Sequence, residues 1–116
     1  MKQLAVGEIV LVKFPFANLR EAKKRPALVL RTTEVTSKAS LVTIAMITSQ
    51  VDGLELEGDV LVSKWKDVNL LHPSLVRLSK MTTIDSELID GRIGHLADSD
   101  QKHVSRTFKK LFASWI

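Results

Sequence analysis

The sequence contains no cysteine, and this absence excludes disulfide scaffolds, thiol catalysis and thiolate metal sites. It also has no long hydrophobic run. Its longest uncharged stretch, residues 39–51, includes polar side chains and falls short of the ~20 mostly apolar residues of a membrane-spanning helix. The N-terminus reaches Glu8 before any apolar stretch of signal-peptide length develops. We therefore expect a cytoplasmic protein with no membrane partner.

Glycine, proline and aromatic residues are also scarce. Five glycines and three prolines leave no linker or low-complexity tract, and tyrosine is absent. What the chain does contain is a core, because Leu, Ile, Val and Phe make up about a third of it, above the roughly 20% below which disorder is common. Its 116 residues fit one domain, 1–116. The formal net charge of +4 permits a polyanionic partner without requiring one.

Short apolar segments separated by turn residues predict a mainly β fold over the first two thirds of the chain. The expected strands are residues 8–14, 26–31, 41–49, 59–63, 74–84 and 92–96. Pro26 suits the first residue of its strand, where a missing N–H costs least. Short helical turns are expected at residues 64–70 and 86–88. Strands of this length are typical of a small barrel or sandwich.

The C-terminus differs, because apolar residues recur there at helical spacing. The positions that share one helical face are Val104, Phe108, Leu111, Phe112 and Trp115. Residues 98–101 resemble a capping box with Asp98 at the N-cap and Gln101 at N3. We predict a helix that closes or flanks the barrel and packs its apolar stripe into the core.

No familiar catalytic motif is present. His72, His95 and His103 lack the spacing of a zinc site, and no carboxylates are grouped near them. We interpret all three as ordinary surface or packing histidines. A glycine-rich phosphate loop, a nucleophile elbow and an acidic triplet for magnesium are absent as well. The sequence therefore predicts no metal and no cofactor.

Two segments remain as candidates for binding or chemistry. The first is a basic cluster, whose members are Arg20, Lys23, Lys24, Arg25 and Arg31. Such a cluster is either a solvated loop or a site where guanidinium and ammonium groups converge on a phosphate. The second segment, residues 48–50 (TSQ), ends the third expected strand and supplies hydroxyl and amide groups. Composition alone leaves the ordinary and the functional interpretation of each segment open.

Several motifs follow one another along nearly the whole chain. They are residues 7–16 (GEIVLVKFPF), 25–30 (RPALVL), 47–50 (ITSQ), 73–77 (PSLVR), 83–85 (TID) and 92–96 (RIGHL). This ordered set resembles the MazF/PemK family of toxins from type II toxin–antitoxin systems. The resemblance implies a small SH3-like barrel of the CcdB/MazF-like kind with a C-terminal α-helix, usually assembled as a homodimer.

The same resemblance implies an activity, namely a metal-independent endoribonuclease (mRNA interferase) that cleaves single-stranded RNA and is neutralised by a cognate antitoxin protein. The catalytic pair of the family corresponds here to Arg25 and Thr48. Attack by the 2′-hydroxyl of the RNA itself would give a 2′,3′-cyclic phosphate and a 5′-hydroxyl. In that reaction Arg25 would neutralise charge on the phosphate, while Thr48 would hold a phosphate oxygen or help to protonate the leaving oxygen.

The residues expected to contact RNA are Phe16, Asn18, Lys24, Ser49, Gln50 and Lys80. Base stacking would rest on Phe14, Phe16 or Trp65. Two departures from the family pattern are the glycine-free loop at residues 17–24 and Lys80, where many members carry glutamine. Two alternatives stay open. One is a CcdB-like, non-catalytic inhibitor of DNA gyrase acting through the C-terminal residues, and the other is an RNA-binding barrel without catalysis.

Overall fold

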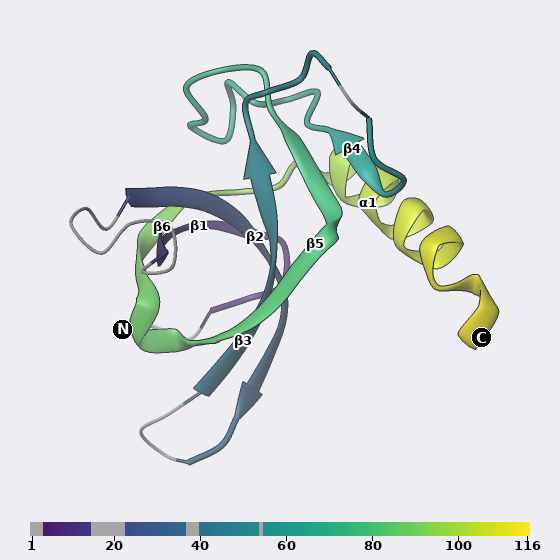
Figure 1. The fold of residues 1–116 in the computed structure, drawn as a ribbon. Coiled ribbons are helices and arrows are strands. Elements are labelled where there is room, and N and C mark those ends of the chain that lie inside the picture. The colour runs from purple at the N-terminus through teal and green to yellow at the C-terminus, as the bar shows by residue number, and fades with distance from the viewer. Residues whose placement is uncertain (1–3, 15–22, 37–39, 54) are drawn as a thin grey trace.

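One antiparallel sheet of six strands dominates the fold (Figure 1). The computed structural model describes residues 4–14, 23–36, 40–53 and 55–116, and the structural statements that follow concern these residues. The strands are β1 (Glu8–Phe14), β2 (Lys23–Glu34), β3 (Ser40–Thr48), β4 (Asp59–Leu61), β5 (Leu75–Asp85) and β6 (Ile89–His95). Their order across the sheet is β4-β5-β3-β2-β1-β6. All six expected strands are therefore confirmed, with ends shifted by a few residues.

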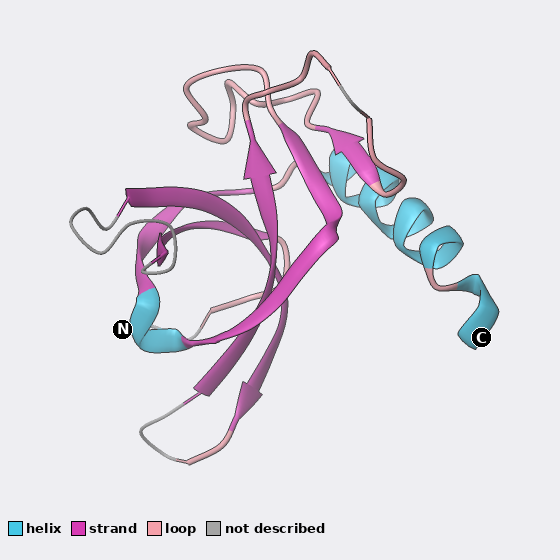
Figure 2. Ribbon diagram, viewed as in Figure 1, coloured by secondary structure: helices cyan, strands magenta, loops and turns pink. Residues whose placement is uncertain are grey.

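The sheet bends strongly but does not close into a barrel. Within the described residues its two edge strands, β4 and β6, pair with one neighbour each and not with one another. Irregular register between Val29 and Arg31 in β2, and between Ala45 and Met46 in β3, marks places where the ladder is interrupted. Such interruptions bend strands and increase their twist. The predicted barrel is thus an open, curled sheet (Figure 2).

The second strand begins earlier than expected. It starts at Lys23, so Pro26 lies inside β2 and pairs with Leu11 of β1. The pairing of β2 with β3 runs from Ala27, directly after the proline. Pro26 therefore stands at the end of that second ladder, where its missing N–H removes no bond from the middle of the sheet.

Side chains of β1, β2 and β3 alternate between two buried clusters, because successive residues of a strand face opposite sides. The first cluster includes Ile9, Leu28 and Ala45 and reaches Val104 of the C-terminal helix. The second lies on the other face, and its members are Leu4, Val10, Val12, Ala27, Val29, Val42, Ile44, Ile84 and Ile89. Both faces of the sheet are therefore covered, and the central strands read as nearly continuous apolar runs.

The predicted C-terminal helix is confirmed as α1 (Asp98–Leu111), but its cap differs from the prediction. The helix begins one residue earlier than expected, so that Ala97 is the N-cap and no side chain caps it. The buried carboxylate of Asp100 instead accepts hydrogen bonds from Ser63 Oγ (2.7 Å) and the backbone N–H of Lys64 (3.0 Å). Asp100 therefore ties the first turn of α1 to the segment after β4. No described helix is long and apolar enough to cross a membrane.

The apolar helical stripe is buried only in part. Val104 is buried, whereas Phe108 is 40% exposed and Trp115, in the 3₁₀ turn η2 (Ala113–Trp115), is 87% exposed. The prediction that the stripe packs into the core holds for Val104 and for Leu111, which is partly buried against the first cluster. It fails for Phe108 and Trp115, because α1 runs past β4 and away from the sheet (Figure 1).

The turn expected at residues 86–88 is confirmed as η1 (Ser86–Leu88). The turn expected at residues 64–70 is present as a run of hydrogen-bonded turns, in which the carbonyl oxygens of Lys64 and Lys66 each accept the backbone N–H three residues further on.

Candidate functional site

A pocket of about 520 Å³ opens where β2 begins and β3 ends. Its polar lining residues are Lys24, Arg25, Thr48, Ser49, Gln50, Asn69, His72 and Ser74. Leu11, Pro26, Ile47, Leu70, Leu71 and Ile93 supply the apolar part of the wall. Three segments far apart in the sequence, with single residues of β1 and β6, therefore form one site.

The register of the sheet explains why Arg25 and Thr48 meet at this pocket. Strands β2 and β3 pair Leu28 with Ala45 and Ala27 with Met46. Continued by two residues, this register places Arg25 across from Thr48 at the end of the sheet. Arg25 is exposed and Thr48 is half-buried, so a ligand in the pocket can reach both side chains.

Strand β5 brings the third segment to the same place. Thr48 pairs with Leu75, the first residue of β5, so the residues before Leu75 leave the sheet beside Ser49 and Gln50. The buried Ser74 donates its Oγ–H to the carbonyl oxygen of His72 (2.8 Å). Its own carbonyl accepts the backbone N–H of Val62 (2.9 Å). The backbone at residue 72 is therefore held on the pocket wall.

The pocket is basic in its described part. Lys24 and Arg25 are its charged lining residues, and no carboxylate is among those that line it. The Lys24 ammonium lies 2.6 Å from the carboxylate of Asp90, and that hydrogen bond lowers the pKa of Asp90 from its ordinary value. Arg25 has no ion-pair partner among the described residues. Its guanidinium is therefore available to an anion.

The other residues predicted to contact RNA do not all lie at this pocket. Lys24, Ser49 and Gln50 line the pocket with Arg25 and Thr48. Lys80 is exposed on β5 and lies outside this lining, while Phe16 and Asn18 fall outside the described residues. Of the aromatic candidates for base stacking, Trp65 packs against the first core cluster. The stacking role expected for it is therefore not supported by its position.

The basic cluster does not converge as a unit. Arg20 and the side chain of Lys23 fall outside the described part of the cluster, and of its three described side chains Lys24 and Arg25 line the pocket. Arg31 instead borders a second pocket of about 480 Å³, between α1 and the sheet. Because Arg31 lies six residues further along β2, the same strand carries the two arginines to different places.

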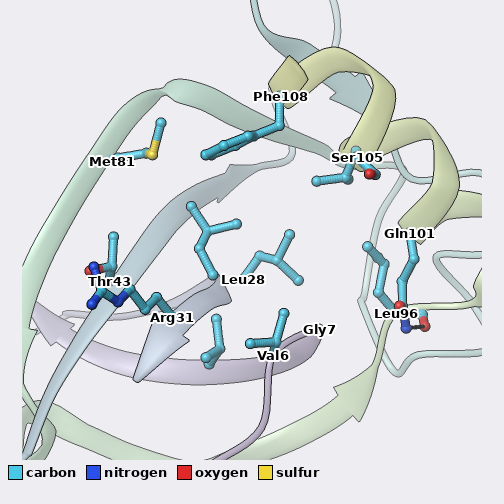
Figure 3. A pocket seen from close by; sticks show the side chains of 13 residues that line it. Val6, Gly7, Leu28, Arg31, Thr43, Met81, Leu96, Gln101, Ser105 and Phe108 are labelled. Carbon is cyan, nitrogen blue, oxygen red and sulfur yellow. Dashed lines mark hydrogen bonds between the residues drawn. The ribbon is translucent and has the colours of Figure 1, made fainter. Parts of the chain in front are cut away.

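The second pocket is mostly apolar. Leu28, Met81 and Phe108 surround it, while Arg31 lies on one side and Gln101 on the opposite side (Figure 3). Across the described chain, His, Asp and Glu side chains form no group of three or more that would suit a metal ion. The first pocket therefore combines the charged and hydroxyl groups that chemistry requires.

Sequence reasoning missed the segment between β4 and β5 as part of the site. Asn69 has a positive φ of 64° and donates from its amide to the carbonyl oxygen of Ile93 (2.6 Å). His72, expected to be an ordinary histidine, lines the pocket with Arg25 and Thr48. The sequence gives one indication that His72 belongs to the site. His72 directly precedes the PSLVR motif, and the strand formed by that motif lies beside the end of β3.

Comparison with known proteins identifies the class that this architecture defines, namely toxins of type II toxin–antitoxin systems. The family model described as "PemK-like, MazF-like toxin of type II toxin-antitoxin system" matches residues 5–112. Because the match spans nearly the whole chain, the chain belongs to the PemK/MazF toxin family, as the sequence motifs predicted. No curated protein matches it.

Solved structures agree with this assignment. Mycobacterium tuberculosis toxin MazF-mt6 is 26% identical, with a TM-score of 0.66 over 91% of this chain and 96% of that one. An endoribonuclease in complex with its cognate antitoxin, from a mycobacterial species, has a TM-score of 0.70 at 9% identity over 96% of each chain. MazF from Deinococcus radiodurans has a TM-score of 0.64 at 20% identity, over 93% of this chain and 94% of that one. The last two likenesses show the fold alone.

Proposed function

We propose that this toxin is an endoribonuclease that cleaves single-stranded RNA, messenger RNA included, without a metal ion. The observation that carries the proposal is that Arg25 and Thr48 line one pocket at the ends of neighbouring strands. The pocket presents positive charge without a lining carboxylate in its described part, which suits a phosphate diester. Membership of the PemK/MazF toxin family supports the same activity, and a solved endoribonuclease of the same fold shows that the fold is compatible with it.

RNA needs no external nucleophile for this reaction, because each ribose carries a 2′-hydroxyl beside the phosphate. In-line attack of that hydroxyl forms a 2′,3′-cyclic phosphate and releases a 5′-hydroxyl. Negative charge builds up on the non-bridging oxygens, and a guanidinium neutralises it through two parallel hydrogen bonds. Arg25 takes this role, since an arginine stays protonated at neutral pH and stabilises charge better than it accepts protons.

Other groups of the pocket position the substrate. The Thr48 hydroxyl, which accepts the backbone N–H of Gln50 (3.2 Å), can donate its own proton to a phosphate oxygen or to the leaving oxygen. Ser49 and Gln50 follow directly and contact the neighbouring nucleotides, and Lys24 contacts the backbone. Phe16, Asn18 and Lys80 are proposed as further RNA contacts.

We also propose a cognate antitoxin protein and a homodimer as the assembly partners. The family belongs to type II toxin–antitoxin systems, and one similar structure holds its own cognate antitoxin. An acidic antitoxin segment would complement a toxin of net charge +4 and block the basic pocket.

The decisive experiment incubates the purified protein with single-stranded RNA in EDTA and maps the new ends. We expect cleavage with 2′,3′-cyclic phosphate and 5′-hydroxyl termini, and a loss of about 10²- to 10³-fold in rate for Arg25→Ala. Arg31→Ala is the matched control, because it removes the same charge from the same strand outside the pocket. An intact protein that fails to cleave, or equal rates for the two variants, would contradict the proposal.

A further inference from the structure

We propose that His72 is the general base of this reaction and accepts the proton of the attacking 2′-hydroxyl. The inference rests on the ribonuclease activity proposed above and adds a catalytic group to it. The starting observation is that His72 lines the same pocket as Arg25 and Thr48, although it comes from a different part of the chain.

The fold fixes the position of His72 relative to the pair. Thr48 and Leu75 are register partners, and His72 lies three residues before Leu75. Pro73 restricts the backbone of the residue that precedes it. The buried Ser74 then holds the carbonyl of residue 72 by a 2.8 Å hydrogen bond. The side chain is exposed, so that its imidazole is open to a substrate in the pocket.

The chemistry of the pocket singles out the same residue. Its other polar side chains are guanidinium, ammonium, hydroxyl and amide groups, none of which exchanges protons readily near neutral pH. Histidine is the side chain suited to that exchange. The charged residues that line the pocket with it are Lys24 and Arg25 from β2, and Asp90 of β6 pairs with Lys24. Among the described residues that line the pocket there is no carboxylate that could act as the base instead.

The step balances without any further reactant. The 2′-oxygen forms a bond to phosphorus as the imidazole takes the 2′-hydroxyl proton. The bond between phosphorus and the 5′-oxygen breaks, and its electron pair leaves with the 5′-oxygen. That oxygen takes a proton from water, directly or through the Thr48 hydroxyl, and the imidazolium returns its proton to the hydroxide formed. The protein ends the cycle unchanged.

The test compares single-turnover cleavage by the intact protein, His72→Gln and the control His103→Gln over a range of pH. His103 is exposed on α1 and lies outside the pocket lining. We expect His72→Gln to lower the rate at neutral pH by about 10²-fold while RNA affinity changes little. The rise of rate with pH that reports deprotonation of a base should disappear in this variant and persist in His103→Gln.

A second substrate separates a base from an acid. In RNA whose 5′-oxygen at the cleavage site is replaced by sulfur, the leaving group departs without a proton. A base remains necessary there, so the defect of His72→Gln should persist. Recovery of the normal rate on this substrate, or an unchanged pH profile in His72→Gln, would overturn the inference. Failure of the intact protein to cleave any RNA would instead contradict the proposed function.

Discussion

The Thr48 side chain combines two roles that a single residue change can separate. Its β-branched carbon skeleton sits in the last position of β3, and its hydroxyl accepts the backbone N–H of Gln50 at 3.2 Å. The same hydroxyl lines the pocket. Valine keeps the shape of threonine and suits a strand, so that only the hydrogen-bonding group is lost.

We therefore expect Thr48→Val to lower the rate of RNA cleavage by about 10²-fold with little effect on folding. Thr48→Ser should restore most of the rate. The measurement is single-turnover cleavage together with a thermal unfolding curve. Thr43→Val serves as the control, because Thr43 lies on the same strand and bonds Thr83 (2.8 Å) outside this pocket. Equal rates for Thr48→Val and Thr43→Val would contradict a role for the hydroxyl.

At the scale of elements, one buried carboxylate joins α1 to the sheet. Asp100 accepts three hydrogen bonds, from the backbone N–H groups of Ser63 and Lys64 and from Ser63 Oγ. Burial alone would raise its pKa, but these hydrogen bonds outweigh burial and lower it. The charged form therefore stabilises the folded state. Because the pKa is lower in the folded state, this contribution is present at neutral pH and is lost as the pH falls through the folded-state pKa.

Asp100→Asn should consequently destabilise the protein by about 1–3 kcal/mol at pH 7, because an amide N–H₂ cannot accept the bonds of the lost oxygen. The difference should shrink at an acid pH below the ordinary pKa of aspartate, as the wild-type carboxylate becomes protonated. Urea unfolding of the wild type and the variant, at pH 7 and at the acid pH, measures this difference in the free energy of unfolding. Asp98→Asn is the control, because Asp98 is exposed in the same turn and makes no capping bond. A difference that is equal at both pH values would rule out the carboxylate as its cause.

The elements themselves were largely predictable, and the reasons are local. Apolar runs with turn residues between them indicated all six strands, and helical spacing indicated α1. The extent of burial along α1 was not predictable. The spacing of Phe108 and Trp115 shows that the helix is amphipathic, but it does not show where along the helix the contact with the sheet ends. The site was predictable only in part. Arg25 and Thr48 lie in motifs, whereas the place of His72 depends on the β3–β5 register, a contact between distant residues.

At the scale of the whole molecule, the question is how much of the net charge acts on the substrate. The described pocket has two cationic lining residues, Lys24 and Arg25, because Arg31 lies at the other pocket. Single-stranded RNA releases counterions in proportion to the phosphates that a protein neutralises.

The two pocket contacts alone predict a slope of about −1.4 when the logarithm of RNA affinity is plotted against that of salt concentration, and a phosphate contact by Lys80 would bring it to about −2.1. The measurement uses intact protein and RNA with 2′-deoxyribose at the cleavage site, which binds without reacting. Arg25→Ala should make the slope shallower by about 0.7, and Arg31→Ala should leave it unchanged. A slope near −3.5 would show that the whole basic cluster contacts the RNA.

The order in which the chain is made gives the composite pocket one more consequence. Arg25 is synthesised early, Thr48 and His72 follow, and Ile93 of β6 completes the wall. A ribosome-bound chain therefore contains Arg25 long before it can form the complete pocket. Under the proposed activity, a chain that stops before Ile93 lacks part of the pocket wall, so it should not cleave the message that encodes it.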